Sequence, residues 1–282
     1  MPLLWVTYTN PGFTLAKKIA QLVDDYQKRF GKKPAILFLE KHGLLISAKS
    51  PNAALRLVRQ VIKLCDSKLK HPVVRDPRFR GDRLAPAQAG GRGTRDEINK
   101  AKRCIRKAVF EATGQKCPIS YFYDDAFAAF WRQRDAKKLL SGVLTPDELV
   151  YANGPAMWVD PMQRTDDGGR TTDDRGRRTE DRRRKNLTSD IARRLNSQIN
   201  KGEKHSVAFL VKDVGLFVAG TKKIATTVRD IVSYSIFIRT NAARMGGILT
   251  LTKKERDFIN QWESESFRMK VAAGSRICSN RD

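Results

Sequence analysis

One histidine lies in a short turn between two apolar runs of the sequence. His42 follows the run Ala35–Glu40 and precedes the run Leu44–Ser47. Short apolar runs broken at Lys41-His42-Gly43 predict two buried strands joined by a sharp turn. An imidazole at such a bend can bind a metal ion or exchange a proton with a substrate. We therefore take His42 as the candidate metal ligand.

Three other polar groups are candidates for the same chemistry. Glu40 would share a face with His42 if the turn kept the alternation of an extended strand; otherwise it is a solvated glutamate at a strand end. Tyr8 and Tyr151 are candidate proton donors. With an ordinary pKa near 10 and no identified partner, they can equally be packing residues.

The elements on either side of the turn follow from the apolar spacing. Residues 14–30 repeat apolar side chains at helical intervals and stop at Gly31, which predicts a helix before the first strand. Ser50 and Pro51 supply an N-cap and a first-turn proline for a second helix that ends near Leu69. Strand, turn, strand and helix thus position His42.

The rest of the chain divides by composition. We expect residues 72–96 to be a Pro-, Gly- and Arg-rich insertion or linker and residues 97–161 a helical connecting region, which the capping-box pattern Thr94–Glu97 introduces. Residues 162–187 contain an imperfect Arg/Asp/Thr repeat that is almost devoid of apolar side chains, so we expect disorder. Residues 188–282 form a further α/β unit with a C-terminal helix, which a second capping box, Thr252–Glu255, introduces.

The strand–turn–strand pattern occurs twice. Residues 205–232 align with residues 33–61 at a constant offset of 172 through the turn, so that Gly43 corresponds to Gly215. This predicts an internal duplication. Val214 occupies the position of His42 in the second copy, so the second copy lacks the chemistry of the histidine. The fold class that we expect is α/β, a layered mixed sheet with flanking helices.

Several motifs in this order resemble the class II aldolase/adducin family. They are Tyr8, Pro11-Gly12 and Leu15-Ala16, then a helix, the turn at residues 39–46, and Pro51 with its helix. Residues 142–160 and 246–270 are similar to the C-terminal region of long rhamnulose-type sugar-phosphate aldolases. The resemblance covers residues 1–71 and about 97–275. It implies an aldolase/adducin-like architecture in which residues 1–71 are the C-terminal half of the aldolase domain, without its N-terminal half.

The resemblance also implies a chemistry, zinc-dependent retro-aldol cleavage of a sugar phosphate, in which the metal stabilises an enediolate. His42 matches the family's last zinc ligand. The family's H-x-H ligand pair has no counterpart in this sequence, and Lys41 stands where the family favours Asn. Because a catalytic zinc needs three protein ligands, the site would be incomplete in this chain. A homo-oligomer or complementing chain could supply the missing ligands; the alternative is a non-catalytic scaffold or remnant of the family.

Charge and cysteine usage bound the partners and the compartment. The net charge of +25 favours anionic partners, and basic residues 100–107 with the Arg-rich residues 177–185 make nucleic-acid binding a second alternative, although no reader motif accompanies them. Four dispersed cysteines indicate neither a zinc site nor a disulfide framework. Without a signal-like N-terminus or a long apolar run, we expect a cytoplasmic protein with no membrane partner.

Overall fold

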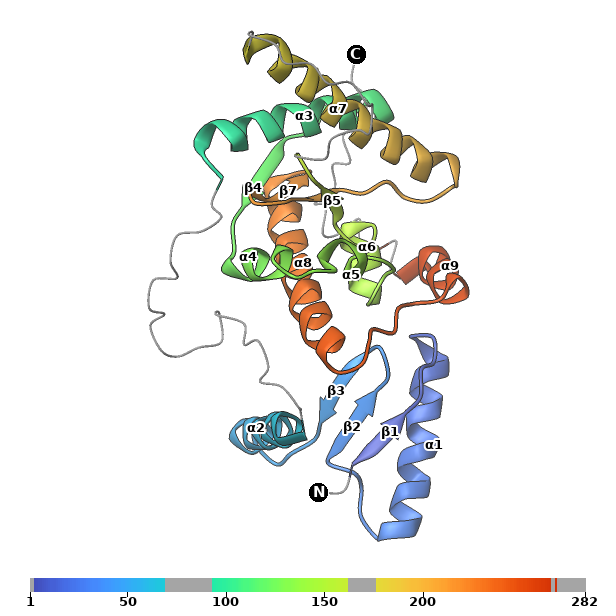
Figure 1. Ribbon diagram of the computed structural model, residues 1–282. Coiled ribbons are helices and arrows are strands. Elements are labelled where there is room, and N and C mark those ends of the chain that lie inside the picture. The colour runs from blue at the N-terminus through green and yellow to red at the C-terminus, as the bar shows by residue number, and fades with distance from the viewer. Residues whose placement is uncertain (1–2, 69–92, 162–175, 265–266, 268–282) are drawn as a thin grey trace.

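The computed structural model describes residues 3–68, 93–161, 176–264 and 267. These residues form an α/β structure with two mixed β-sheets and flanking helices (Figure 1). The predicted α/β class is therefore confirmed. The strands lie in two separate sheets, however, where the sequence suggested a single layered sheet. Within these ranges, no helix is long and apolar enough to cross a membrane.

The first sheet has the order β1-β2-β3, from β1 (Leu4–Val6), β2 (Ile36–Leu39) and β3 (Gly43–Ile46). β1 and β2 are parallel because α1 (Phe13–Phe30) forms the crossover between them. β2 and β3 are antiparallel and joined by the turn that contains His42. α2 (Pro51–Lys68) follows. We call residues 3–68 the first unit; the two predicted helices and the strand–turn–strand pattern are present.

The second sheet has the order β4-β7-β6-β5, from β4 (Ile119–Phe122), β5 (Met157–Val159), β6 (Ala208–Val211) and β7 (Gly215–Ala219). β5 and β6 are parallel, whereas the other neighbours are antiparallel. Every residue of β5, β6 and β7 is buried. Such continuous apolar strands require helices on both faces of the sheet.

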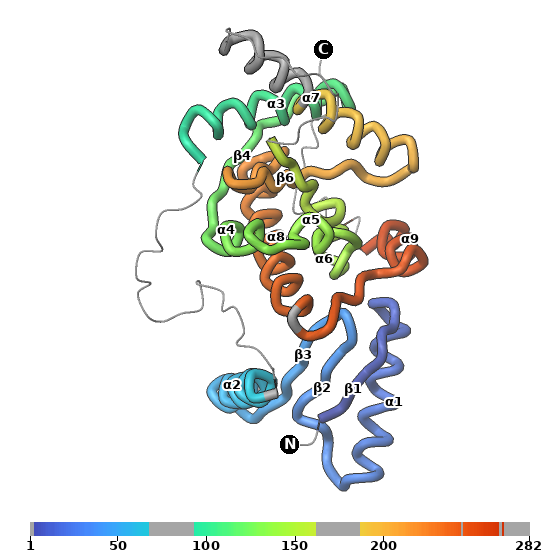
Figure 2. The backbone as a smooth tube through the Cα atoms, in the orientation of Figure 1, coloured from blue at the N-terminus to red at the C-terminus, as the bar shows by residue number. Residues whose placement is uncertain are grey.

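Two layers of helices cover the second sheet. α3 (Arg95–Thr113) and α7 (Gly176–Asn200) lie side by side on one face, where Ile105, Ile191 and Leu195 pack against Phe209 and Phe217 (Figures 1 and 2). α4 (Asp125–Trp131) and α8 (Lys222–Arg244) cover the other face. α5 (Ala136–Leu139), α6 (Pro146–Ala152) and α9 (Lys253–Gln261) complete the fold. The capping boxes predicted at Thr94 and Thr252 are both formed.

The two sheets share an order of elements and a set of hydrogen bonds. The series β1-α1-β2-β3-α2 corresponds to β5-α7-β6-β7-α8, which we call the second unit. Three backbone hydrogen bonds recur at the offset of 172 on the donor side. In the first unit they join Glu40 N to Val6 O, His42 N to Leu39 O and Ser47 N to Ala35 O; in the second, Lys212 N to Val159 O, Val214 N to Val211 O and Ala219 N to Val207 O.

Some expected segments differ from the structure. Residues 97–161, expected to be a helical connecting region, contain most of α3, then α4, α5 and α6, and also the strands β4 and β5. The insertion predicted at 72–96 lies outside the described residues up to position 92, and the disorder predicted for 162–187 lies outside them up to 175. Residues from Gly176 onward belong to α7. α9 ends at Gln261, where Trp262 adopts an extended conformation, and residues 263, 264 and 267 are again helical.

Candidate functional site

The turn between β2 and β3 contacts α9 through an ion pair. Lys41 Nζ lies 2.9 Å from both carboxylate oxygens of Glu255. The two side chains are only 14% and 15% exposed. Figures 1 and 2 place α9 next to the first unit. We call Tyr8, Glu40, Lys41, His42 and Glu255 the junction cluster, because they lie where the first unit meets α9.

The backbone of the turn sets the directions of Lys41 and His42. The chain reverses at Lys41 and Gly43, on either side of His42, which have φ values of 60° and 123°. At Gly43, any residue other than glycine would be strained. The imidazole of His42 stacks on the ring of Tyr8, with centroids 5.2 Å apart. His42 Nε2 lies 2.8 Å from Thr9 O. Because a carbonyl only accepts, this nitrogen carries a hydrogen.

The hydroxyl of Tyr8 is buried and has no hydrogen-bond partner among the described residues. Its ring packs against the apolar cluster of Val143, Leu149, Val150, Leu251 and Ile259. Lys41 Nζ lies 4.9 Å from the ring centroid. Burial, and secondly the negative charge of Glu255, raise the pKa of Tyr8 above its ordinary value. The phenol is therefore protonated at neutral pH and can act as a donor.

Glu255 has a structural and an electrostatic role. As the third residue of α9 it accepts from the backbone N–H of Thr252, at 2.6 Å, and completes the capping box. Burial pushes the pKa of Glu255 upward, but hydrogen bonds from the Thr252 amide and from Lys41 outweigh this effect and leave the pKa below its ordinary value. Glu255 is therefore ionised and holds Lys41 in place.

Glu40, which follows β2, contacts the segment between β1 and α1. Its Oε2 accepts a hydrogen bond of 2.8 Å from the backbone N–H of Tyr8, so it connects β2 to the chain that leaves β1. Glu40 is therefore a structural acceptor and not a solvated carboxylate at a strand end. Tyr151, the second candidate proton donor, lies in α6 and packs against the same apolar cluster as Tyr8. The fold thus brings together Tyr8, Glu40 and His42, while the link to Glu255 has no counterpart in the sequence prediction.

The described residues do not suit a metal ion or a dinucleotide. In the part of the chain that the structure describes, no three His, Cys, Asp or Glu side chains gather closely enough to hold a metal ion. The role of His42 as a zinc ligand stays a prediction. The turn from β1 into α1 is the place where a dinucleotide would approach a helix N-terminus. Here it has a single glycine, Gly12, and a Cβ at Gly12 would lie 3.1 Å from the Trp262 ring. The described turn does not fit a pyrophosphate.

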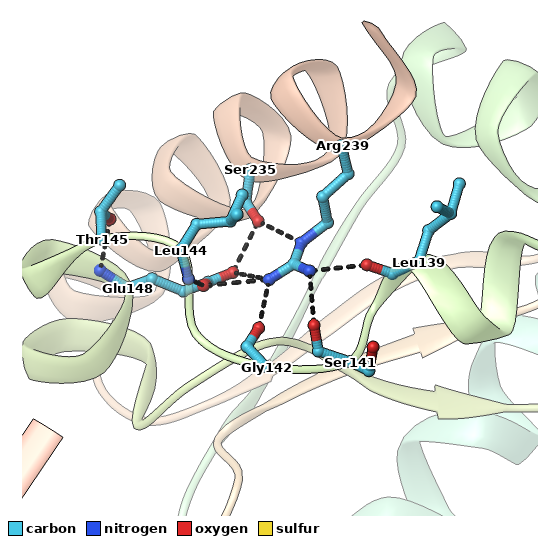
Figure 3. Close-up of polar contacts among 8 residues, drawn as sticks. All are labelled: Leu139, Ser141, Gly142, Leu144, Thr145, Glu148, Ser235 and Arg239. Atoms are coloured by element: carbon cyan, nitrogen blue, oxygen red, sulfur yellow. Dashed lines mark hydrogen bonds and ion pairs between the residues drawn. The ribbon is translucent and has the colours of Figure 1, made fainter. Parts of the chain in front are cut away.

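A second polar cluster lies in the interior and is structural. Arg239 and Glu148 are 0% and 1% exposed and form an ion pair of 3.1 Å (Figure 3). The guanidinium also donates to Ser235 and to the carbonyl oxygens of Leu139, Ser141 and Gly142. All five guanidinium N–H groups are therefore satisfied. Because no donor is left over, this cluster fixes residues 139–144 against α8 and offers nothing to a ligand.

The groove between α3 and α7 is open and lacks convergent reactive groups among the described residues. Its volume is about 660 Å³, and its polar lining comes from Glu111 of α3 and from one face of α7, including Arg193 and Asn196. Arg193 is already paired with Asp190. We therefore take the junction cluster as the candidate functional site.

The chain is similar to a distant relative among known proteins. It is 22% identical over 275 residues to a Bacillus subtilis (strain 168) protein named uncharacterized oxidoreductase YuxG, and the match covers 95% of this chain. The chain spans 38% of that protein's length. No protein-family description matches the chain. No solved structure matches it either, so the likeness to the aldolase/adducin fold stays a prediction.

This match corrects the predicted function. A relative that aligns with nearly the whole chain is named as an oxidoreductase, so the prediction of a sugar-phosphate aldolase, or of a non-catalytic scaffold of that family, is wrong. Nucleic acid as a partner stays a prediction. The physical reason lies in the turn. The second unit has the same left-handed residue and glycine at Asp213 and Gly215, with Val214 between them. The strand–turn–strand pattern that suggested an aldolase therefore reports a backbone geometry, which forms without the histidine.

Proposed function

We propose that the chain takes part in oxidoreduction and that the junction cluster supplies the proton in that reaction. The observation that carries this proposal is the similarity of 95% of the chain to a protein named as an oxidoreductase. Because the chain spans 38% of that protein, the proposal concerns the proton transfer at the junction cluster and assigns no position to the electron carrier. Because a phenol can protonate the oxygen of a carbonyl group as it is reduced, the reaction that suits the cluster is the reduction of a carbonyl compound to an alcohol.

The proposed proton donor is Tyr8. Reduction of a carbonyl group adds a hydride to carbon and a proton to oxygen. Tyr8 keeps its proton at neutral pH because the ordinary pKa of tyrosine is already near 10 and burial raises it further. Its hydroxyl has no hydrogen-bond partner among the described residues. After the O–H bond of Tyr8 breaks and the proton bonds to the substrate oxygen, Lys41, whose Nζ is 4.9 Å from the ring, would stabilise the phenolate. Solvent would then return the proton.

The hydroxyl of Tyr8 is enclosed between the first unit and the cluster beside α9. A substrate oxygen reaches it only if these surfaces separate. The Lys41–Glu255 ion pair and the close approach of Trp262 to Gly12 hold them together. In this proposal, the side chains of Glu255 in α9 and of Trp262 just after α9 therefore control access to the Tyr8 hydroxyl.

The test is an assay of the purified full chain with three reduced carriers, NADH, NADPH and a free flavin, and with a panel of aldehydes and ketones. We expect carrier oxidation that requires both the chain and a carbonyl compound. Tyr8→Phe should lower the rate by about 100-fold, the low end of general-acid contributions. Tyr26→Phe is the matched control, since the Tyr26 hydroxyl is also buried without a partner in the described residues, in α1.

Two outcomes would overturn the proposal. One is the absence of carrier oxidation with every carrier and carbonyl compound. The other is a rate that Tyr8→Phe and Tyr26→Phe leave equally unchanged, because the reaction would then occur elsewhere on the chain.

We also propose that the two units arose by duplication of one β-α-β-β-α element, as the sequence offset predicts. The shared order of elements and the three recurring backbone hydrogen bonds support this proposal. His42→Val, which gives the first turn the residue found in the second, should give a folded chain with an unchanged far-UV circular dichroism spectrum. An unfolded product would contradict the equivalence of the two turns.

A further inference from the structure

β3 forms the open edge of the first sheet in the described residues. Ser47 N, just after β3, donates to Ala35 O, just before β2. Because N–H groups alternate in direction along an antiparallel strand, those of Leu44 and Ile46 point away from β2. The edge is therefore able to pair with a further strand.

The corresponding edge of the second sheet is occupied. β4 pairs with β7 in antiparallel orientation, and Gly220 N donates to Pro118 O at 3.0 Å. Leu216 and Phe217 of β7 are 0% exposed, whereas their counterparts Leu44 and Leu45 in β3 are 39% and 44% exposed. The corresponding edge strand is thus covered in the second unit and exposed in the first.

A helix follows the covering strand in the second sheet. Asp124 and Asp125 lead from β4 into α4, whose Phe130 packs edge-on against Trp158 of β5 with centroids 6.5 Å apart. Trp158 is 8% exposed. Trp5 occupies the matching position at the centre of β1, and it is 55% exposed. An equivalent of α4 is missing above Trp5 in the described structure.

The bare surface continues onto α2. Leu55 and Ile62 lie seven residues apart on one side of this helix and are 47% and 54% exposed. Large apolar side chains that gather in this way are typical of an interaction surface. The paired residues Trp5, Phe38 and Leu44 share one face of the sheet, whereas Leu45 lies on the other. We call Trp5, Leu44, Leu55 and Ile62 the β3 surface.

The charge around the β3 surface selects its partner. Residues 3–68 contain twelve Lys and Arg against four Asp and Glu, a surplus of eight positive charges. Arg56, Arg59 and Lys63 lie on α2 itself. A second copy would bring two such surfaces together and be repelled, whereas a segment with acidic residues would be attracted.

We propose that the β3 surface binds a strand–turn–helix segment of another polypeptide, with its strand antiparallel to β3, acidic residues at its turn and an apolar helix above Trp5. The mode is β-strand addition, in which backbone hydrogen bonds give affinity and the side-chain row gives specificity. The segment formed by β4 and α4 does the same for β7 within this chain. This inference is independent of the proposed redox function.

The test uses a synthetic peptide with the sequence of residues 117–133, which contains β4 and α4, titrated into the full chain by calorimetry. We expect saturable binding that weakens as salt increases. Leu44→Asp should weaken binding at least tenfold. Ile46→Pro should do the same, because it removes an outward N–H while leaving the bonds to β2 intact. Leu249→Asp, at a leucine 79% exposed in the loop before α9, is the matched control and should bind normally.

Far-UV circular dichroism establishes that each variant is folded, and Leu44→Asp covers the case in which Ile46→Pro is not. No binding by the wild-type chain would overturn the proposal, as would binding that neither variant weakens, since the peptide would then compete with β4 at β7. Equilibrium sedimentation tests whether a second copy of the chain occupies the surface instead. A dimer that Leu44→Asp dissociates would show that a second copy fills the surface and would overturn the assignment to another polypeptide.

Discussion

Lys41 and Glu255 are 214 residues apart in sequence, and their side chains meet at 2.9 Å. This ion pair joins the turn of the first unit to the first turn of α9. Both ends are held in place independently, Lys41 by a left-handed turn and Glu255 by the capping box with Thr252. The pair therefore loses little side-chain freedom on forming, which favours it over an ordinary surface ion pair.

Replacement of Glu255 should change the dependence of stability on pH. Its pKa is lowered in the folded chain, so its ionised form contributes stability that is fully present above the ordinary value of 4.5 and is lost as the pH falls through the lower folded value. Glu255→Gln should remove this contribution, about 1 kcal/mol at neutral pH. Urea unfolding at a series of pH values measures it.

Glu97→Gln provides the control, because Glu97 caps α3 with Thr94 as Glu255 caps α9. Both variants retain a capping side chain. An equal loss in the two variants would show that capping alone explains the effect.

The ionisation of Tyr8 should respond to the same replacement. Burial and Glu255 raise the pKa of Tyr8. Glu255→Gln removes the negative charge and leaves the Lys41 cation 4.9 Å from the ring, so the pKa should move down. In an alkaline titration, the difference in tyrosinate absorbance between each chain and its Tyr8→Phe variant isolates this group. In the proposed reaction, the loss of activity at high pH should shift downward by the same amount. A pKa that stays unchanged would contradict the described contact.

The buried pair Glu148–Arg239 should be necessary for stability. Glu148→Gln leaves a guanidinium with 0% exposure without a counter-charge, and breaking a buried pair in this way costs about 3–5 kcal/mol. The exposed pair Lys253–Asp257, with Lys253 81% exposed, is the control. Asp257→Asn should cost less than about 1 kcal/mol. Denaturant midpoints of the two variants give the comparison, and similar losses would mean that burial does not govern the cost.

Two equivalent glycines should tolerate alanine differently. Gly43 and Gly215 have φ values of 123° and 149°, so alanine is strained at both. A Cβ at Gly215 would lie 2.7 Å from Phe122 O in β4, whereas nothing among the described residues lies within 4 Å at Gly43. Thermal unfolding should therefore show a larger loss of stability for Gly215→Ala than for Gly43→Ala, by about 1–3 kcal/mol. Equal costs would indicate that β4 does not cover this turn.

The local elements were predictable because their signals are local. Apolar periodicity and Gly31 delimit α1, the Thr94 and Thr252 capping boxes begin α3 and α9, and the offset of 172 identifies the corresponding turns. The function was not predictable in the same way. A turn motif suggested an aldolase, although its glycine is explained by a backbone angle and its histidine is replaced by Val214 in the equivalent turn.

The sequence by itself determined the helices, the strands and the two equivalent turns, because caps, glycines and apolar spacing act within a few residues. Only the tertiary structure decided that the strands form two sheets, that β4 covers one edge while β3 stays open in the described residues, and that Glu255 meets Lys41 beside Tyr8. These relationships depend on packing between segments far apart in the chain. The same capping box forms at Glu97, which makes no such long-range contact with the described residues. Local sequence patterns therefore determine the individual helices, strands and turns. Long-range packing determines which side chains lie next to one another, and hence which chemistry they can perform.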